Sequence, residues 1–269
     1  FAILLGSDNG GTVTPTDGSV TKAKLADEVD IFAGTSLSAA DLGAGVHIKT
    51  GDSGGSVTST ADELVVEGSG DMGIQLMGGA SSSCGIAFGD SGDSNVGLLT
   101  YNHANNSMSM KTNDTVHMTI SSDGEVTKPL QPCFRIGSGT QDNVAVSTNV
   151  DAVFDNEIFD IGANFASNIF TAPITGKYFF TVSYRLQNLD SASTYVQVVL
   201  VGSNRNTTLH TLKEISHHMS ADSEYSFTGT AILDMDANDT ANVRIRIQAG
   251  TAQTDVSNDG SYFMGYLIS

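Results

Sequence analysis

The pattern of hydrophobic and polar positions divides the chain into a short helical stretch and a long β-rich remainder. Residues 19–32, SVTKAKLADEVDIF, place apolar side chains at loosely helical spacing, which predicts a short helix. After it, short apolar runs stand between turns rich in glycine, serine, asparagine and aspartate, which is typical of β-strands. We therefore expect an all-β protein, preceded over residues 1–60 by a linker or neck with a short helix.

Residues 61–128 have one texture, in which short strands alternate with turns such as GSGD, GDSGD and SSDG. The alternation SMSMKT places Met108 and Met110 on one strand face, and we interpret these methionines as core fillers. Large apolar residues are few, so a single copy would struggle to enclose a core. Copies wrapped around a common axis would solve this, because each chain supplies one wall of a shared core. The pattern predicts a β-rich segment that several copies build around a common axis; the resemblances below imply a trimeric fibre shaft.

The texture changes at TKPLQPCFRI, where Pro129 and Pro132 interrupt strand pairing. Beyond this point the strands are longer and carry most of the aromatic residues. In NVRIRIQA the apolar residues are expected to face inward, while Arg244, Arg246 and Gln248 face outward. Several strands at turn-punctuated spacing predict a β-sandwich head domain over residues 129–269.

Composition narrows the function classes. There are 30 acidic and 12 basic residues, a net charge of −18, so the chain repels phosphate backbones and nucleic-acid binding is not expected. No stretch is long and apolar enough to cross a bilayer as a helix. The first residue is not methionine, so we expect a fragment or a processed piece. Cys84 and Cys133 are too few for a disulfide framework, and two free thiols fit assembly in a reducing cytosol.

The string GDSGG at residues 51–55 is the one that surrounds the nucleophilic serine of trypsin-like proteases. A protease would need a distant histidine and aspartate, whereas His47 is only six residues upstream of Ser53. The near copy GDSGD recurs at residues 89–93. We interpret both strings as turns, in which the aspartate side chain caps and glycine supplies positive φ. No catalytic residues are expected, and the chain is not expected to be an enzyme.

The segment DMDANDT, residues 234–240, begins like a calcium loop but lacks the glycine and the glutamate of an EF-hand. The two interpretations left open are a tight turn between strands and a calcium site of another kind.

Residues 130–269 resemble the globular head of complement component one-q, the jelly roll shared with the tumour necrosis factor superfamily. The resemblance rests on NIFTAPITGKYFFTVSY, VVLVG, FTGTAILDMDANDTANVRI and GSYFMGYLI. It implies a jelly-roll head that forms homotrimers, with calcium as an implied ligand near the trimer axis. The collagen-like Gly-X-Y run of the complement proteins is missing here.

Residues 12–128 resemble tail-fibre and tail-spike shafts of bacterial viruses, on DGSVTKAKLAD and on LVVEGSG with IAFGDSGDSNVGLLTYNHANNSMSMKTNDTVHMTISSDGEVT. The two resemblances together imply a structural virion protein, the distal part of a bacteriophage tail fibre that attaches to the host surface. Its expected partners are two further copies, virion tail proteins upstream, and a host polysaccharide or outer-membrane protein. Such a fibre acts outside the cell as part of the virion. The alternatives are a surface or secreted trimeric bacterial adhesin and, third, a polysaccharide depolymerase.

In the resembled fold the last strand, residues 261–269, is expected to run towards the base of the head, its neighbour 177–187 outwards, and the next strand, 241–248, back again. This order predicts that the turns 188–193, 234–240 and 256–260 share the free end of the head. That end would gather five aspartates per chain, and crowded carboxylates favour calcium or magnesium. The candidate receptor-binding residues are Asp190, Asp236, Asn238, Asp239, Asn258 and Asp259. The candidate metal ligands are Asp222, Asp234, Asp236 and Asp239.

Overall fold

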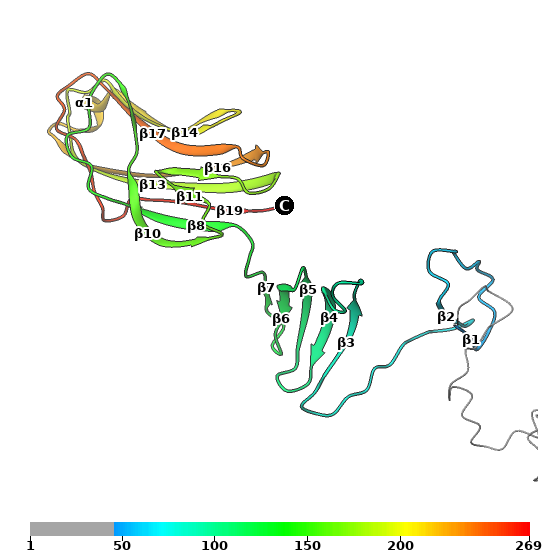
Figure 1. Cartoon of the computed structure of the whole chain (residues 1–269). Helices are drawn as coiled ribbons and strands as arrows, with labels where there is room; N and C mark the ends of the chain where they lie inside the picture. Colours follow the sequence, from blue (N-terminus) through cyan, green and yellow to red (C-terminus); the bar gives the residue numbers. More distant parts are fainter. Residues whose placement is uncertain (1–45) are drawn as a thin grey trace, which may run out of the picture. The chain divides into compact units, whose positions relative to one another are not determined.

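The computed structural model describes residues 46–269, and the chain divides between Gln75 and Leu76. The helix expected over residues 19–32 lies outside the described residues. In the first part, strands β1 (Val46–Lys49) and β2 (Leu64–Glu67) pair in parallel (Figure 1). The sequence pattern places a boundary between segments at residue 60. Strand β1 lies before that boundary and β2 after it, so the two segments are joined by strand pairing.

Residues 83–127 form a five-stranded antiparallel sheet in which each strand pairs with the next along the chain (Figure 1). Asn113 and Asp114 form the two-residue turn between the third and fourth of these strands, with φ of 47° and 57°. A turn with two positive φ angles matches the twist of a hairpin, and asparagine and aspartate tolerate it. The strands are β3 (Ser83–Phe88), β4 (Gly97–Asn102), β5 (Ser107–Thr112), β6 (Thr115–Ile120) and β7 (Val126–Thr127).

Cross-strand register gathers the apolar side chains of this sheet on one face. Met110 lies opposite Leu99 on one side and Met118 on the other, and Met108 lies opposite Tyr101 and Ile120. The same rows continue into β3 and β7. We name this surface the methionine face, and it comprises Cys84, Ile86, Phe88, Leu99, Tyr101, Met108, Met110, Met118, Ile120 and Val126. The opposite face carries mostly small or polar residues, such as Thr100 and Ser109, together with Leu98 and Val116.

Two sheets packed face to face form the head, which confirms the predicted β-sandwich (Figure 1). The first sheet has the order β10-β8-β19-β13-β16, with β18 paired to β13, and the second has the order β11-β12-β17-β14-β15, with β9 paired to β17. The first comprises β8 (Cys133–Ser138), β10 (Phe154–Ile161), β13 (Gly176–Leu189), β16 (Ser223–Met235), β18 (Asp255–Val256) and β19 (Tyr262–Leu267). The second comprises β9 (Asn149–Asp151), β11 (Phe165–Ala166), β12 (Ile169–Thr171), β14 (Tyr195–Gly202), β15 (Asn206–Lys213) and β17 (Thr240–Gln248). One helical turn, α1 (Ile215–His218), follows β15.

The head core is built on aromatic rings from both sheets. Phe134 lies at its centre, with its ring centroid 4.9 Å from that of Phe170 and 5.0 Å from that of Phe263. Alternation along β13 buries Tyr178 and Phe180 completely, as a strand with one face on a core requires. Gly265 faces these rings, and a Cβ there would lie 2.6 Å from Phe180 Cδ1. Glycine is therefore needed at this position for close packing.

The predicted order of three head strands is partly wrong. The last strand, β19, does pair with β13 as expected, with Phe180 opposite Gly265. Residues 241–248 were expected beside them, but β17 belongs to the second sheet, between β12 and β14. A jelly roll moves the chain from one sheet to the other between successive strands, and strand alternation alone does not encode that crossover.

Candidate functional site

The three turns expected to share one end of the head lie at two opposite ends. Gly176 at the start of β13 pairs with Met235, while Leu189 at its end pairs with Ser223. Residues 234–240 therefore lie at the end where β13 begins, and this is also where Cys133 pairs with Tyr266, close to the C-terminus. Residues 188–193 and 256–260 lie at the other end, the outer end. The prediction that these turns share one acidic end is thus wrong. Strand β16 runs antiparallel to β13, so the turn that follows β16 lies at the same end as the C-terminus.

At the outer end, Asp190 is a structural residue. Its side chain is buried, and its carboxylate accepts hydrogen bonds from the Thr251 N–H at 2.6 Å, the Thr251 hydroxyl at 2.8 Å and the Ala192 N–H at 2.8 Å. These donors lower the pKa of Asp190 below its ordinary value, with the Thr251 N–H as the largest cause. Asp190 thus holds the turns 188–193 and 249–251 together and offers little to a receptor.

Acidification should reveal this role of Asp190. A carboxyl group whose pKa is lower in the folded than in the unfolded chain stabilises the fold above the unfolded pKa of about 3.9. That stabilisation is lost as the pH falls through the folded pKa. We expect the unfolding free energy of the wild type to fall more steeply below about pH 4 than that of Asp190→Asn. Chemical denaturation between pH 2 and 7 measures it, with Asp236→Asn as the charge-matched control; equal slopes for wild type and Asp190→Asn would contradict the role.

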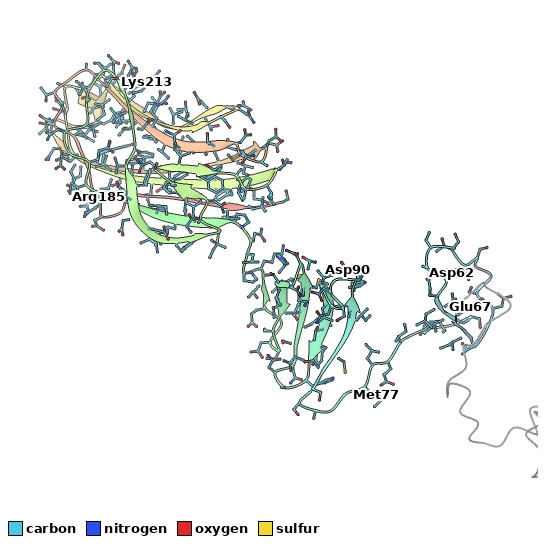
Figure 2. The ribbon with its side chains drawn as sticks, viewed as in Figure 1. Asp62, Glu67, Met77, Asp90, Arg185 and Lys213 are labelled. Carbon is cyan, nitrogen blue, oxygen red and sulfur yellow. The ribbon has the colours of Figure 1, made fainter. Side chains whose placement is uncertain are left out.

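The other candidates at the outer end are exposed. Asp222 accepts hydrogen bonds from the N–H and hydroxyl of Ser191 and from the Gln253 amide, and these donors lower its pKa. Asp259 forms an ion pair of 2.9 Å with Arg185, which also bonds the Glu224 carboxylate (Figure 2). Asn258, next to Asp259, is exposed. Asn258 and Asp259 remain accessible to a ligand, although Arg185 already neutralises the Asp259 carboxylate.

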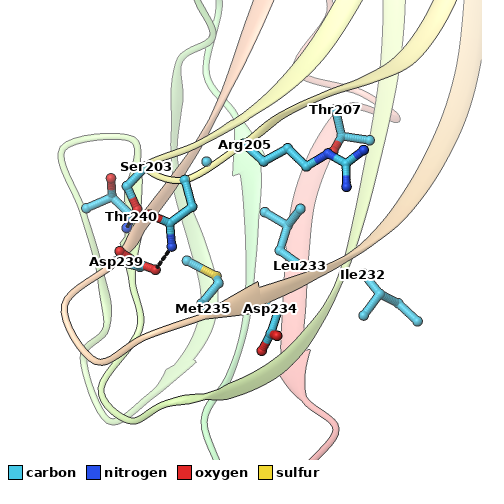
Figure 3. Close-up of a pocket in the computed structure, with 11 residues that line it drawn as sticks. Ser203, Arg205, Thr207, Ile232, Leu233, Asp234, Met235, Asp239 and Thr240 are labelled. Carbon is cyan, nitrogen blue, oxygen red and sulfur yellow. Dashed lines mark hydrogen bonds between the residues drawn. The ribbon is translucent and has the colours of Figure 1, made fainter.

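At the opposite end, Asp239 and Asn238 shape the turn itself. Asp239 accepts hydrogen bonds from the Asp236 N–H at 2.8 Å and from the Asn204 amide (Figure 3). Asn238 has a φ of 74° and donates its N–H to the Ala172 carbonyl. A pocket of about 410 Å³ lies beside this turn, lined by Asp234, Asp239 and Arg205 among others (Figure 3). Of the two interpretations of residues 234–240, the tight turn is the one that the backbone adopts.

The metal ligands expected from the sequence do not come together. Asp222 precedes β16, and Asp234 lies near its far end, roughly 40 Å away along an extended strand. Within residues 46–269, no group of three or more His, Cys, Asp or Glu side chains is placed to hold a metal ion. The four candidate ligands therefore do not form one metal site within a single chain.

The string GDSGG forms the predicted turn. The Gly54 N–H donates to Asp52 Oδ1 at 3.0 Å, and Gly54 has a φ of 72°. Ser53 directs its N–H and hydroxyl to the Glu67 carboxylate, at 2.8 and 3.1 Å. The second string repeats the aspartate cap, because the Gly92 N–H donates to Asp90 Oδ1 at 2.7 Å, but Gly92 is not among the residues with positive φ. The aspartate-capped turn is confirmed at both places, and the positive φ only at Gly54.

Two apolar surfaces are exposed in the single chain. On the methionine face, Phe88 is 63% exposed and Met110 48% exposed, so the residues interpreted as core fillers have no core within one copy. The outer face of the first head sheet carries a second surface. There Phe179 lies opposite both Tyr266 and Ile232, with the Phe179 and Tyr266 rings 5.3 Å apart. We name this surface the first-sheet patch, and it comprises Phe159, Phe179, Ile232, Met264 and Tyr266. The exposed Arg135 lies on the same face, between Phe159 and Met264.

The first-sheet patch was missed in the sequence, although a signal for it exists. KYFF contains three consecutive aromatic residues, and side chains alternate along a strand, so Phe179 must face away from the core. The same holds for Tyr266 beside Leu267. The residues described include no helix long and apolar enough to span a membrane. Cys84 and Cys133 are both free thiols, as expected.

Comparisons with known proteins concern the head. The head is similar to the globular domain of zebrafish complement 1qA protein, at 16% identity over 52% of this chain and 98% of that chain, with a TM-score of 0.38. It is also similar to murine APRIL in a crystal structure at pH 8.5, at 12% identity over 51% of this chain and 99% of that one, with a TM-score of 0.37. No curated protein matches the chain. The C1q domain matches residues 134–268, half of the chain, so the chain belongs to the C1q domain family.

Proposed function

We propose that the chain is the distal part of a homotrimeric bacteriophage tail fibre, whose head binds a receptor on the host cell surface. C1q domains commonly form homotrimers and are often modules of binding or adhesion proteins, typically without enzymatic activity. In this proposal residues 76–127 belong to the fibre shaft, the head is its tip, and the protein acts outside the cell as part of the virion. The upstream end would connect to other tail proteins.

The observation that carries the proposal is the methionine face. Five of its ten apolar residues are exposed and five are half-buried, while the opposite face of the same sheet is mostly small and polar. From the exposed fractions, the apolar surface is on the order of 500 Å², the size of the largest patch on a typical monomer, and such patches are often functional. Three such faces around one axis would enclose a shared core, which is how a thin fibre acquires stability that one chain lacks.

The short connection between sheet and head favours copies of the chain as the occupant of this face. Strand β7 ends at Thr127 and β8 begins at Cys133, so only residues 128–132 intervene. Heads joined as a homotrimer would hold the three sheets at an effective concentration of roughly millimolar. A different protein free in solution would rarely reach a millimolar concentration. The methionine face also has no charged residue that would favour a different protein over another copy of the chain.

In the head, the first-sheet patch is a second apolar surface through which copies of the chain would associate. Ile232 is 60% exposed and Tyr266 44% exposed, and a hollow of about 320 Å³ lined by Phe159, Met264 and Tyr266 lies over this face. An apolar patch of this kind marks an interaction surface. Both parts of the chain thus offer one apolar face each for association, and the remaining head surface is left for the receptor.

The location of the protein distinguishes a fibre from the alternatives. Virus particles and cell envelopes from the producing culture are separated on a density gradient, and each fraction is analysed by mass spectrometry for peptides of this chain. We expect the peptides to co-migrate with the major capsid protein. Peptides confined to the envelope would overturn the proposal in favour of a bacterial adhesin. Release of reducing sugar from host polysaccharide by the purified chain would instead indicate a depolymerase.

A further inference from the structure

We propose that the outer face of the second head sheet is a binding site for an acidic polysaccharide, held chiefly by Arg246 with Arg244 beside it. The inference rests on the proposed function, because it names the chemistry of the receptor. It uses a surface separate from both apolar faces and from the aspartate-rich turns.

Polar and planar side chains cover this face in cross-strand rows. Arg246 lies opposite Gln197 on β14 and Asn149 on β9. In the neighbouring row, Gln248 lies opposite Tyr195, which in turn lies opposite Lys213, labelled in Figure 2 at the end of β15. We name this surface the arginine face, and it comprises Asn149, Tyr195, Gln197, Lys213, Arg244, Arg246 and Gln248.

The arginine face is basic, whereas the chain as a whole is acidic. Three of the chain's 12 basic residues project from it, in a protein with a net charge of −18. Among its paired positions the one carboxylate is Asp151, which lies opposite Arg244 and accepts a hydrogen bond from Arg244 Nε at 3.3 Å. Arg244 and Arg246 are two residues apart on one strand, so their stems are about 7 Å apart. Asp151 forms an ion pair with Arg244, so within this pair the positive charge left for an anionic ligand is that of Arg246.

Arg246 is held in place by neutral groups. Its Nε and Nη2 donate to Gln248 Oε1 at 3.2 and 2.8 Å, so its guanidinium is oriented but its charge is not neutralised by a carboxylate. Its Nη1 has only a 3.5 Å contact with Asn149 Oδ1, which is too long for a strong hydrogen bond. The Nη1 hydrogens are therefore available to a ligand. A planar guanidinium fixed in this way suits a planar carboxylate, which accepts parallel N–H bonds.

The neighbouring side chains suit a sugar. Gln197, Gln248 and Asn149 each offer amide donors and acceptors, the groups that match hydroxyls. Tyr195 is half-buried in the same face, and its ring combines an apolar surface with a polar tip. The arginine face thus offers a cation to a sugar carboxylate, amides to sugar hydroxyls and an aromatic ring to sugar C–H groups. Together these groups favour a polysaccharide that contains uronic acids. A protein partner would instead be expected to require a larger apolar centre.

Binding of the full chain to immobilised polygalacturonate tests the site, with neutral dextran and a phosphorylated mannan as separate arms. We expect binding to polygalacturonate, weaker binding to dextran, and a loss of at least roughly tenfold in Arg246→Gln, as for a hydrogen bond to a charged group. Lys177→Gln removes the same charge from the first sheet and should bind like the wild type. Far-ultraviolet circular dichroism and melting of Arg246→Gln establish that the variant is folded.

Three outcomes would overturn the inference: no binding to polygalacturonate, equal losses in Arg246→Gln and Lys177→Gln, or stronger binding to the phosphorylated mannan. The result is separable from the fate of the proposed function. Peptides found in virions together with absent polygalacturonate binding would reject the site and leave the fibre assignment intact. Specific binding to polygalacturonate by a protein found in the cell envelope would support the site and reject the fibre assignment.

Discussion

Met110→Lys is expected to disrupt the association of copies through the methionine face. Met110 lies in the middle of this face, between Leu99 and Met118, and is 48% exposed in one chain. In a monomer a lysine there would be solvated and nearly neutral for stability. In a trimer it would place three unpaired ammonium groups in a shared apolar core, which costs several kcal/mol. Hydrogen exchange of residues 83–127 measures the effect, and the variant should lose the protection that the wild type shows.

Ser109→Lys is the matched control, because it introduces the same side chain one residue away on the polar face. It should keep the protection of the wild type, and both the wild type and the control should have about three times the 28.0 kDa chain mass in light scattering. Equal protection in Met110→Lys and Ser109→Lys would show that the methionine face is not packed against other copies. A folded wild-type monomer at micromolar concentration would contradict the homotrimer itself.

Alternation within a strand was predictable because it is a local property. The outward orientation of Arg244 and Arg246 and the shared face of Met108 and Met110 follow from the two-residue period of a strand. The aspartate-capped turns were equally local, since the donor at Gly54 is two residues from its acceptor Asp52. Neither prediction needed knowledge of which strand lies beside which.

The ends of the head were not predictable in this way. Placing residues 234–240 requires the knowledge that β16 returns beside β13 towards the chain termini and that β17 then crosses to the second sheet. These pairings join residues far apart in the sequence. The role of Asp190 was hidden for the same reason, because its main donor, Thr251, is 61 residues away. An aspartate that holds two distant turns together looks, in the sequence, like any exposed turn residue.

The methionine residues were assigned correctly to one face. The core expected around them was one shared between copies, and Met108 and Met110 are partly exposed in the single chain. Sequence patterning reports which side of a strand is apolar, not which molecule covers it. The mismatch between apolar patterning and exposure within one chain is what makes association with further copies the natural explanation.

Phe134→Ala is expected to destabilise the head by about 3–5 kcal/mol, the largest single effect in the core. The ring of Phe134 contacts those of Phe165, Phe170 and Phe263 at centroid distances of 4.9–5.1 Å, and the side chain is 1% exposed. Its removal would leave a cavity at the centre of the sandwich, where both sheets are held by strand pairing and cannot collapse. Chemical denaturation at a fixed protein concentration measures the loss, because an oligomer's stability depends on concentration.

A double-mutant cycle with Gly265→Ala tests whether packing around this ring is the cause. The added Cβ would lie 2.9 Å from Phe134 Cε1 and 2.6–2.8 Å from two carbons of Phe180, so Gly265→Ala alone should cost about 1–3 kcal/mol. In the Phe134→Ala background one of these clashes is gone, and the Phe180 ring gains space to shift. The cost of Gly265→Ala should therefore be smaller there by at least roughly 0.5 kcal/mol. Strict additivity of the two substitutions would mean that the cavity and the glycine act independently, contrary to the close packing of Phe134, Phe180 and Gly265.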